Sequence, residues 1–378
     1  MSTLITSLDT PAALVDVPRM QRNIQRMQQR MEGLGVRLRP HVKTSKCLPV
    51  IHAQIAAGAS GVTVSTLKEA EHCFSQGIDD VLYAVAIAPG KLPQALALRR
   101  AGCNLSVLTD SVQGARAIVA FAREHDEALP VWIEVDCDGH RSGLAAEDPA
   151  LIDVARILSE GAVQLRGVMT HAGSSYQLDN TEALQALAEQ ERALCVHAAE
   201  RIRKAGIACA DVSIGSTPTA LSAQNLDGVT EVRAGVYVFF DLVMHNIGVC
   251  QTEELALSVL TTVIGHQLAK GWIITDAGWM AMSRDRGTQR QRHDFGYGQV
   301  CSEAGDWIDG ARVTGANQEH GIITLGDTCH ADLAALFPIG SRLRILPNHA
   351  CATGAQFPHY HALDANGAVH TWSRLHGW

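Results

Sequence analysis

Several features are missing from this sequence, and each absence excludes a class of protein. No apolar run in the 378 residues approaches the roughly 20 that a membrane span requires, so we expect no membrane contact. The N-terminus, Met1-Ser2-Thr3-Leu4, lacks a basic segment followed by an apolar one, and we expect no signal peptide. An excess of positive charge is missing too. The formal net charge of -8 argues against a nucleic-acid partner.

The ten cysteines form no Cys-x-x-Cys pair. In a chain of this size, their scatter predicts reduced thiols in the cytoplasm and not a disulfide framework. The chain also lacks a Gly-x-Ser-x-Gly elbow, a Walker loop and a Gly-x-Gly-x-x-Gly segment that opens a helix. We therefore do not expect a serine hydrolase, a P-loop enzyme or a Rossmann dehydrogenase.

Short apolar runs alternate with helical stretches over the first two-thirds of the chain. An opening strand, Ala12 to Asp16, and an amphipathic helix precede eight such runs, and a helical stretch lies between each run and the next. This alternation is typical of a parallel (β/α)8 barrel of the TIM type. The runs are Val36–Arg39, Gly61–Ser65, Asp80–Ile87, Leu105–Thr109, Val131–Asp136, Leu165–Thr170, Asp211–Gly215 and Glu231–Phe239.

The pattern changes after about residue 250, where apolar runs are separated by Gly, Asn and Asp and long helices are missing. We predict a barrel over residues 10–250 and a C-terminal, mostly antiparallel β domain over residues 251–378 together with 1–9. The predicted strands of the β domain are Leu257–Gly265, Trp272–Asp276, Val313–Thr314, Ile322–Leu325, Ser341–Leu346 and Val369–Leu375.

A lysine lies just after the first barrel strand, in Pro40-His41-Val42-Lys43-Thr44-Ser45-Lys46. The helix-like run from Leu48 to Ala57 leaves Lys43 at a strand-to-helix junction, which is the catalytic face of a barrel. A partly desolvated lysine there can lose its proton and form a Schiff base. A lysine taken alone is more often a solvated loop residue, so this interpretation depends on the rest of the chain.

Polar loops follow the later strands. Asp136–Gly143 carries Arg141, whose guanidinium suits an oxygen of a bound ring. Thr170–Tyr176 carries His171, which can stack on an aromatic ring, and Tyr176, which can donate to one of its atoms. Each loop alone is also typical of ordinary turns, and their common position after barrel strands is what favours a site.

Small and hydroxyl-bearing residues accompany the seventh and eighth strands. Ser216 and Thr217 follow the seventh, while Gly235 and Tyr237 lie within the predicted eighth. Backbone N–H groups can converge on an anion beside small residues, and hydroxyls add donors. The loops after strands seven and eight are the recurrent phosphate site of this barrel, which makes them our candidates.

The predicted β domain contains a His-x-Cys pair, His349 and Cys351. If the pair lies on an extended strand end, both side chains point to the same side. Imidazole and thiolate together suit zinc or another divalent first-row metal. Taken alone, such a pair is more often a packed imidazole and a buried apolar thiol.

Taken together, these residues resemble the fold-type III pyridoxal-phosphate enzymes, which share the fold of alanine racemase. Within that family the chain looks like the metal-dependent group of D-serine dehydratases and D-threonine aldolases, over essentially its whole length. The resemblance implies pyridoxal 5'-phosphate bound through Lys43, with its phosphate held by Ser216, Thr217, the backbone near Gly235, and Tyr237. It places Arg141, His171 and Tyr176 around the pyridine ring.

The resemblance also implies that His349 and Cys351 hold a divalent cation (Zn, Mn, Co or Mg) and that two copies form a homodimer. In this family His-x-Cys accompanies dehydratases and His-x-Asp accompanies aldolases, so Cys351 favours dehydration. We expect a lyase that acts on a D-3-hydroxy amino acid, with D-threo-3-hydroxyaspartate giving oxaloacetate and ammonia. D-serine dehydration, aldol cleavage on the same scaffold and a non-catalytic pyridoxal-phosphate carrier stay open as alternatives.

Overall fold

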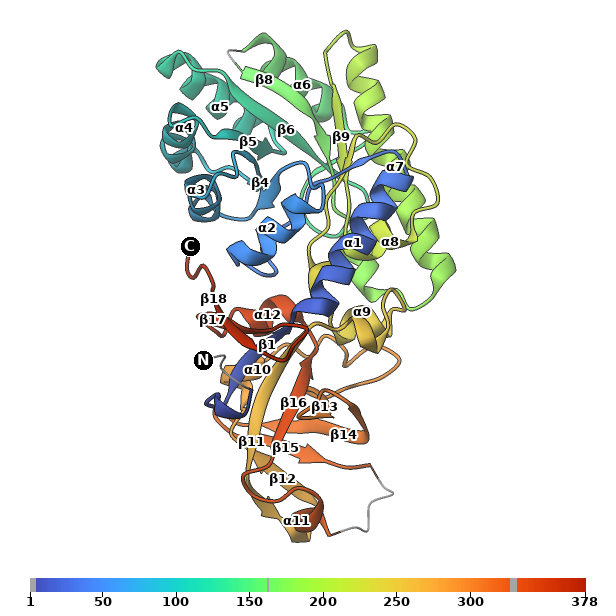
Figure 1. Cartoon of the computed structure of the whole chain (residues 1–378). Helices are drawn as coiled ribbons and strands as arrows, with labels where there is room; N and C mark the ends of the chain where they lie inside the picture. Colours follow the sequence, from blue (N-terminus) through green and yellow to red (C-terminus); the bar gives the residue numbers. More distant parts are fainter. Residues whose placement is uncertain (1–4, 162, 327–331) are drawn as a thin grey trace. The chain divides into compact units, whose positions relative to one another are not determined.

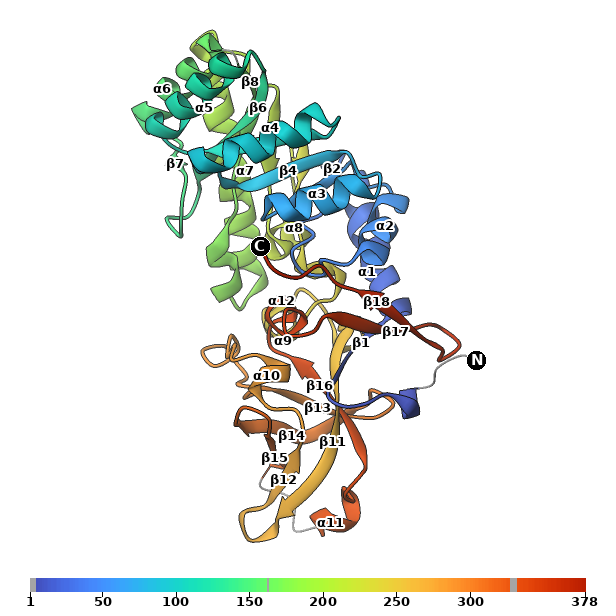
Figure 2. The same ribbon diagram turned by 90° about the vertical axis from the view of Figure 1, so that its left-hand side faces the viewer.

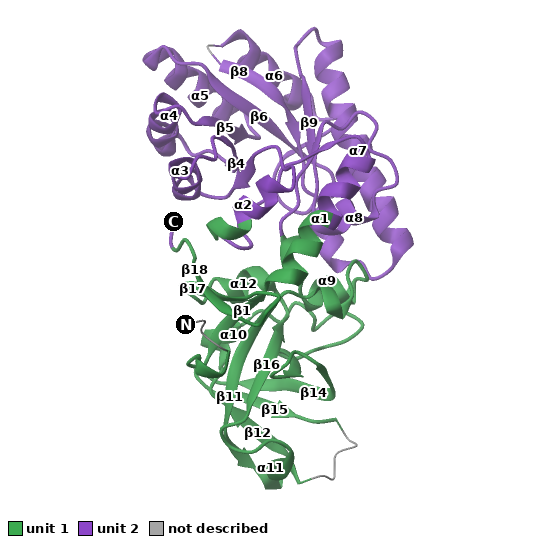
Figure 3. Ribbon diagram, in the orientation of Figure 1, with its two compact units in different colours: residues 1–25, 47–50, 236–376 green, residues 26–46, 51–235, 377–378 purple. Residues whose placement is uncertain are grey.

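A computed structural model of the chain describes residues 5–161, 163–326 and 332–378. Residues Met1–Leu4, on which the expectation of no signal peptide rests, lie outside that part. The chain divides into two compact units, coloured separately in Figure 3. The barrel unit contains residues 26–46, 51–235 and 377–378, and the β-rich unit contains residues 1–25, 47–50 and 236–376. These units place residues 10–25 and 236–250 with the β-rich part, and the domain boundaries 10–250 and 251–378 stay a prediction.

Eight strands of the described chain form a parallel sheet in the order β2-β10-β9-β8-β6-β5-β4-β3. Figure 1 labels β4, β5, β6, β8 and β9 of this sheet. A parallel bridge between His41 and Thr63 joins the end of β2 to β3, so the sheet closes on itself as a barrel. The predicted (β/α)8 barrel is thus confirmed. The strands are β2 (Arg37–Leu38), β3 (Val62–Val64), β4 (Asp80–Ala86), β5 (Asn104–Thr109), β6 (Leu129–Asp136), β8 (Val163–Met169), β9 (Asp211–Ile214) and β10 (Glu231–Val232); β7 (Leu144–Ala145) pairs with β6.

Helices connect the barrel strands and end where the sequence has turn residues. They are α2 (Leu48–Ala56), α3 (Leu67–Ser75), α4 (Leu92–Arg100), α5 (Val112–His125), α6 (Pro149–Glu160), α7 (Thr181–Lys204) and α8 (Thr217–Ser222); α1 (Val17–Gly33) precedes β2. The hydroxyl of Thr66 accepts a hydrogen bond from the backbone N–H of Glu69 and caps α3. The turn at Gly77 has a positive φ of 82°, which glycine adopts at little cost.

The eighth predicted strand was too long. β10 ends at Val232, and the apolar run after Gly235 turns into a short 3-10 helix, η4 (Val236–Val238). Every residue of that run is buried, and a fully buried apolar run does not distinguish a strand from a helical turn. Tyr237 therefore lies outside the barrel strand in which we placed it.

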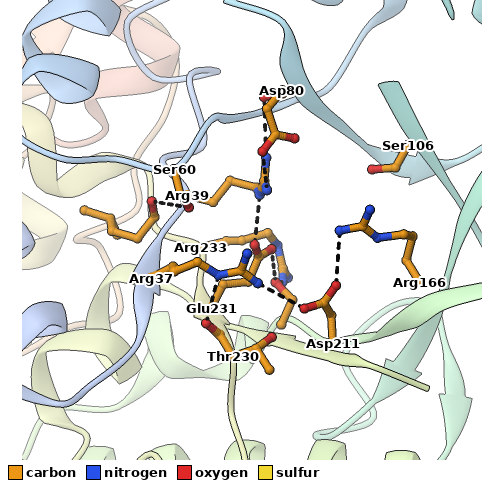
Figure 4. A network of polar contacts seen from close by, with 12 residues as sticks. Arg37, Arg39, Ser60, Asp80, Ser106, Arg166, Asp211, Thr230, Glu231 and Arg233 are labelled. Carbon is orange, nitrogen blue, oxygen red and sulfur yellow. Dashed lines mark hydrogen bonds and ion pairs between the residues drawn. The ribbon is translucent and has the colours of Figure 1, made fainter. Parts of the chain in front are cut away.

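An ion network is buried among the barrel strands (Figure 4). The Arg39 guanidinium lies between two carboxylates, at 3.0 Å from Glu231 and 3.0 Å from Asp80. The Ser213 hydroxyl donates to Glu231 at 2.7 Å, and Arg233 donates to Ser213. Burial raises the pKa of Glu231, but the charge of Arg39 and the hydrogen bonds outweigh it, so the pKa is lowered. The network links β2, β4, β9 and β10.

The β-rich unit is built on one mixed sheet in the order β12-β15-β14-β13-β16-β11-β1-β17-β18. All its pairings are antiparallel except β1 with β17. Long β11 lies between β1 and β16, as Figure 2 shows. The strands are β1 (Ala12–Asp16), β11 (Leu257–Gln267), β12 (Trp272–Thr275), β13 (Gly298–Ser302), β14 (Trp307–Ala316), β15 (Gly321–Thr324), β16 (Arg342–Pro347), β17 (His359–Leu363) and β18 (Val369–Ser373).

The predicted β domain is confirmed as mostly antiparallel, although β13 and β17 were missed. Helices of this unit are short: α9 (Leu242–Asn246), α10 (Trp279–Met282), α11 (Leu333–Leu336) and α12 (Ala350–Gly354). None of the described cysteines forms a disulfide. In the part of the chain that the structure describes, each helix is too short or too polar to cross a membrane.

Candidate functional site

The predicted cofactor residues of the barrel unit follow different strands at their C-terminal ends. Lys43 follows β2, Arg141 follows β6, and His171 and Tyr176 follow β8. Ser216 and Thr217 follow β9 and Gly235 follows β10. In a parallel barrel these ends share one face, so the structure brings the residues to the same mouth. Both Lys43 and Arg141 are exposed there, whereas Ser216 and Thr217 are buried.

His171 is held in one orientation at this mouth. Its Nδ1 lies 2.9 Å from the carbonyl oxygen of Gly215, which can only accept, so Nδ1 carries the proton and Nε2 keeps its lone pair. Burial and the nearby charge of Lys43 lower the pKa of His171 to about 3. The ring centroid of Tyr176 lies 6.2 Å away at an interplanar angle of 41°. The site therefore presents a neutral imidazole beside a phenol.

Ser216 has a structural task that the sequence did not reveal. Its hydroxyl caps α8 by accepting from the backbone N–H of Thr219, and it also contacts the hydroxyls of Ser175 at 3.0 Å and Thr219 at 2.9 Å. The buried carboxylate of Glu191 accepts from the backbone N–H of Gly215 at 3.1 Å. The loop is thus shaped by its own hydroxyls and by a carboxylate behind it.

Two glycines allow the backbone to pass closely at this mouth. Gly215 has a φ of 132°, and a Cβ there would lie 2.2 Å from the carbonyl oxygen of Arg233. A Cβ on Gly235 would lie 2.9 Å from the carbonyl oxygen of His41. Larger residues would displace the loops that surround Lys43, which explains why both positions are glycine.

The remaining predicted residues lie in the β-rich unit. Tyr237 is fully buried in η4. His349 is the residue before α12, and Cys351 is on that helix, so strand alternation does not relate them as we expected. β16 ends at Pro347, two residues before the pair, because proline cannot donate to a continuing ladder. The two side chains nevertheless meet, since the thiol and the imidazole are hydrogen-bonded.

Asp285 is a site residue that the sequence did not indicate. Its Oδ2 accepts from Nδ1 of His349 at 2.7 Å, and that hydrogen bond lowers the pKa of Asp285. The carboxylate and the imidazole are 64 positions apart in the chain. The segment 284–292 contains four arginines, a composition typical of a solvated basic loop, and no local spacing points to the aspartate.

The donor set of the β-rich unit fits a divalent metal in part. Imidazole and thiolate are ligands of zinc and of other first-row metals. Among the described residues, no group of three His, Cys, Asp or Glu side chains is arranged to hold a metal. Two protein ligands leave the other positions to water or to substrate, which suits a catalytic and not a structural metal.

The barrel mouth fits pyridoxal phosphate. An exposed lysine, a neutral imidazole, close-passing glycine backbone and buried hydroxyls are the groups that an aldehyde, a pyridine ring and a phosphate require. The amine of Lys46, the other lysine of this segment, lies 2.8 Å from the carboxylate of Glu69.

Comparison with known proteins defines the class. Residues 15–243 match the family model "Alanine racemase, N-terminal domain", and residues 256–363 match "Putative serine dehydratase domain". The first match spans more than half of the chain, so the chain belongs to the alanine racemase-like family, a fold family of pyridoxal-phosphate-dependent enzymes.

Its relatives within that family include dehydratases. The chain is 67% identical over 380 residues, 100% of both sequences, to "D-threo-3-hydroxyaspartate dehydratase" of Delftia sp. (strain HT23). It is 29% identical to "D-serine dehydratase" of Dictyostelium discoideum, covering 97% of this chain and 96% of that one. A solved structure of a D-threo-3-hydroxyaspartate dehydratase, a cysteine-to-alanine variant in the metal-free form, is 67% identical with a TM-score of 0.98 over 100% of both chains.

Proposed function

We propose that this protein is a lyase that dehydrates D-threo-3-hydroxyaspartate to oxaloacetate and ammonia, using pyridoxal phosphate and a divalent metal. The observation that carries the proposal is the 67% identity over the full length of both sequences to a dehydratase of that substrate. The barrel mouth with Lys43 and the thiol–imidazole pair of Cys351 and His349 supply the residue types that such a reaction needs.

The cofactor would be held from several strands of the barrel. We assign its covalent attachment to Lys43, and its phosphate to Thr217, the backbone near Gly235 and the loop that Ser216 shapes, with Tyr237 as the further candidate. Arg141, His171 and Tyr176 would surround the ring. When bound, pyridoxal phosphate takes up the negative charge that develops when the bond from Cα to hydrogen breaks.

Lys43 would also act as the base. Its amine, released when substrate binds, removes the proton from Cα, as a lysine with reduced hydration can do. The neutral imidazole of His171 supports this role, because it adds no positive charge beside the amine or the ring. The α-proton therefore moves to Nζ of Lys43.

The leaving group is the β-hydroxyl, and hydroxide leaves poorly without help. His349 and Cys351 would hold the cation, which supplies Lewis acidity at that oxygen. A base at the hydroxyl would instead favour aldol cleavage. A cation held by an imidazole and a thiolate would act on the hydroxyl as a Lewis acid and not as a base. The pair of His349 and Cys351 therefore supports elimination of water.

The second carboxylate of the substrate needs a cation. Lys46 is already paired with Glu69, and Arg286 is paired with Asp294 at 3.0 Å. Arg284 stacks on the ring of Trp279, with its guanidinium carbon 4.2 Å from the centroid. The pairing of Lys46 argues against that lysine, and we propose the arginine-rich loop of residues 284–292 as the candidate.

An ammonia-release assay tests the proposal. Holoenzyme is given D-threo-3-hydroxyaspartate, its β-epimer, D-serine or D-threonine, with and without a chelator. We expect ammonia from the first substrate above all, loss of activity with chelator and recovery with added divalent metal. Glycine with an aldehyde would establish an aldolase, and absence of turnover on every substrate would favour a carrier. Light scattering of the holoenzyme tests the homodimer that family membership implies.

A further inference from the structure

We propose that Asp285 is a positioning residue that orients His349 toward the metal. Oδ2 of Asp285 lies 2.7 Å from Nδ1 of His349. An ionised carboxylate only accepts, so Nδ1 must carry the proton, and Nε2 is the ring nitrogen left for a metal. The inference rests on the proposed function, because it assigns a role within the same metal site.

The carboxylate of Asp285 is itself fixed. Its Oδ1 accepts from the backbone N–H of Gly287 at 2.8 Å, which leaves Oδ2 for His349. The backbone N–H of Asp285 donates to the hydroxyl of Ser283 at 3.2 Å. A carboxylate held at both oxygens loses little freedom when it orients a ring, so the imidazole is set before any metal arrives.

The residue next to His349 fastens the loop that carries Asp285. The buried side chain of Asn348 donates to the carbonyl oxygens of Asp285 at 3.0 Å and Gly296 at 2.8 Å. Its own Oδ1 accepts from the hydroxyl of Thr288 at 3.0 Å. Because Asn348 and His349 are neighbours in the chain, these hydrogen bonds fix the backbone of Asp285 relative to that of His349.

The geometry separates this role from direct metal binding. Asp285 lies at the Nδ1 edge of the imidazole, whereas a metal would bind at Nε2 on the other edge. Another nearby carboxylate, that of Asp241, accepts hydrogen bonds from the backbone. Its oxygens accept from the backbone N–H groups of Met244 at 3.0 Å and Ala350 at 2.9 Å, so it supports the starts of α9 and α12.

Metal titration of the pyridoxal-phosphate-loaded, metal-stripped protein tests the role. Co²⁺ is the probe, since its visible bands report ligand geometry, and a competing chelator gives the affinity. We expect Asp285→Ala to lower the affinity about 10- to 100-fold and to change the Co²⁺ spectrum at saturation. Asp285→Asn keeps an acceptor for Nδ1 and should restore the spectrum with a smaller loss of affinity.

The matched control is Asp294→Ala, which removes a carboxylate from the same loop without touching His349. It should leave the Co²⁺ affinity and spectrum unchanged. Unchanged affinity in Asp285→Ala, or an equal loss in Asp294→Ala, would overturn the inference. His349→Ala and Cys351→Ala distinguish failure of the metal site from failure of the role of Asp285. If both variants keep the wild-type Co²⁺ affinity, the proposed metal site is wrong as well. If both lose affinity and Asp285→Ala does not, only the role of Asp285 is wrong.

Discussion

Nζ of Lys46 lies 2.8 Å from Oε1 of Glu69, and the two side chains are 13% and 1% exposed. The same carboxylate accepts from the backbone N–H of Ser65 at 2.9 Å, at the start of α3. Lys43, three residues earlier, is exposed at the barrel mouth. The two lysines of one short segment therefore differ in their surroundings, because Lys46 is nearly buried in an ion pair and Lys43 is exposed.

Lys43→Ala should remove the covalent attachment of the cofactor and the base at Cα. We expect the visible absorbance band of the holoenzyme to disappear and turnover to fall about 10³-fold or more. Absorbance spectroscopy on dialysed protein checks the first effect. A variant that keeps the band after dialysis would remove Lys43 from its assigned role.

Lys46→Ala should behave in the opposite way. It leaves the nearly buried carboxylate of Glu69 without its cation, so we expect a loss of about 3 kcal/mol in the free energy of unfolding. The absorbance band of the holoenzyme should persist. Denaturant titration followed by circular dichroism measures the loss, and Lys46→Met combined with Glu69→Gln should recover part of it. Stability equal to wild type in Lys46→Ala would contradict the structural role.

Ser216→Ala and Thr217→Ala together should weaken cofactor retention about tenfold or more and leave the metal content unchanged, because they change only the loop after β9. Ser216→Ala alone should cost about 1 kcal/mol of stability, since its hydroxyl caps α8. Equilibrium dialysis of pyridoxal phosphate and metal analysis check the first statement. If the double variant loses metal and keeps the cofactor, the assignment of this loop is wrong.

The neutral imidazole of His171 predicts a pH dependence of stability. The unfolded chain binds this proton near pH 6.5, whereas the folded chain binds it only near its pKa of about 3. Because the unfolded state then holds more protons, the stability falls as the pH drops from 6.5 toward 3. His171→Asn should make the melting temperature less sensitive to pH over that window. An unchanged slope would contradict the lowered pKa.

The lowered pKa of Glu231 predicts a dependence of the same sign, at lower pH. Its pKa is lowered from 4.5 in the folded barrel, so its stabilisation is present above that value and is lost as the pH falls below it. Glu231→Gln breaks the buried pair with Arg39 and should cost about 3–5 kcal/mol at pH 7. The difference from wild type should shrink in acid. Denaturant titrations at pH 7 and pH 4 measure it.

Much of the barrel could be predicted because its strands and helices alternate with clear periods. The predicted run Asp80–Ile87 is mostly apolar, short and followed by a helix, and the observed strand β4 covers Asp80–Ala86. The strand prediction was wrong after Gly235, because a buried apolar run there is compatible with a strand or a turn. In the β-rich unit, β13 (Gly-Gln-Val-Cys-Ser) gives no clear alternation, whereas β17 (His-Tyr-His-Ala-Leu) alternates over only five residues, two of which are histidines.

The candidate site residues likewise divide into those that the sequence indicates and those that it does not. Lys43, His171 and Ser216 could be placed at one barrel mouth because each follows a barrel strand, and their roles stay a prediction. Asp285 depends on a contact with His349 across the fold, which no local spacing encodes. The capping role of Ser216 was likewise invisible until α8 was seen to begin at Thr217.

The central claim is that this protein eliminates water from D-threo-3-hydroxyaspartate, and product stoichiometry tests it most directly. We would follow the reaction of the metal-loaded holoenzyme by NMR and quantify both products. The account predicts one ammonia and one oxaloacetate for each substrate consumed, with no glycine. Glycine and glyoxylate in equal amounts would contradict it.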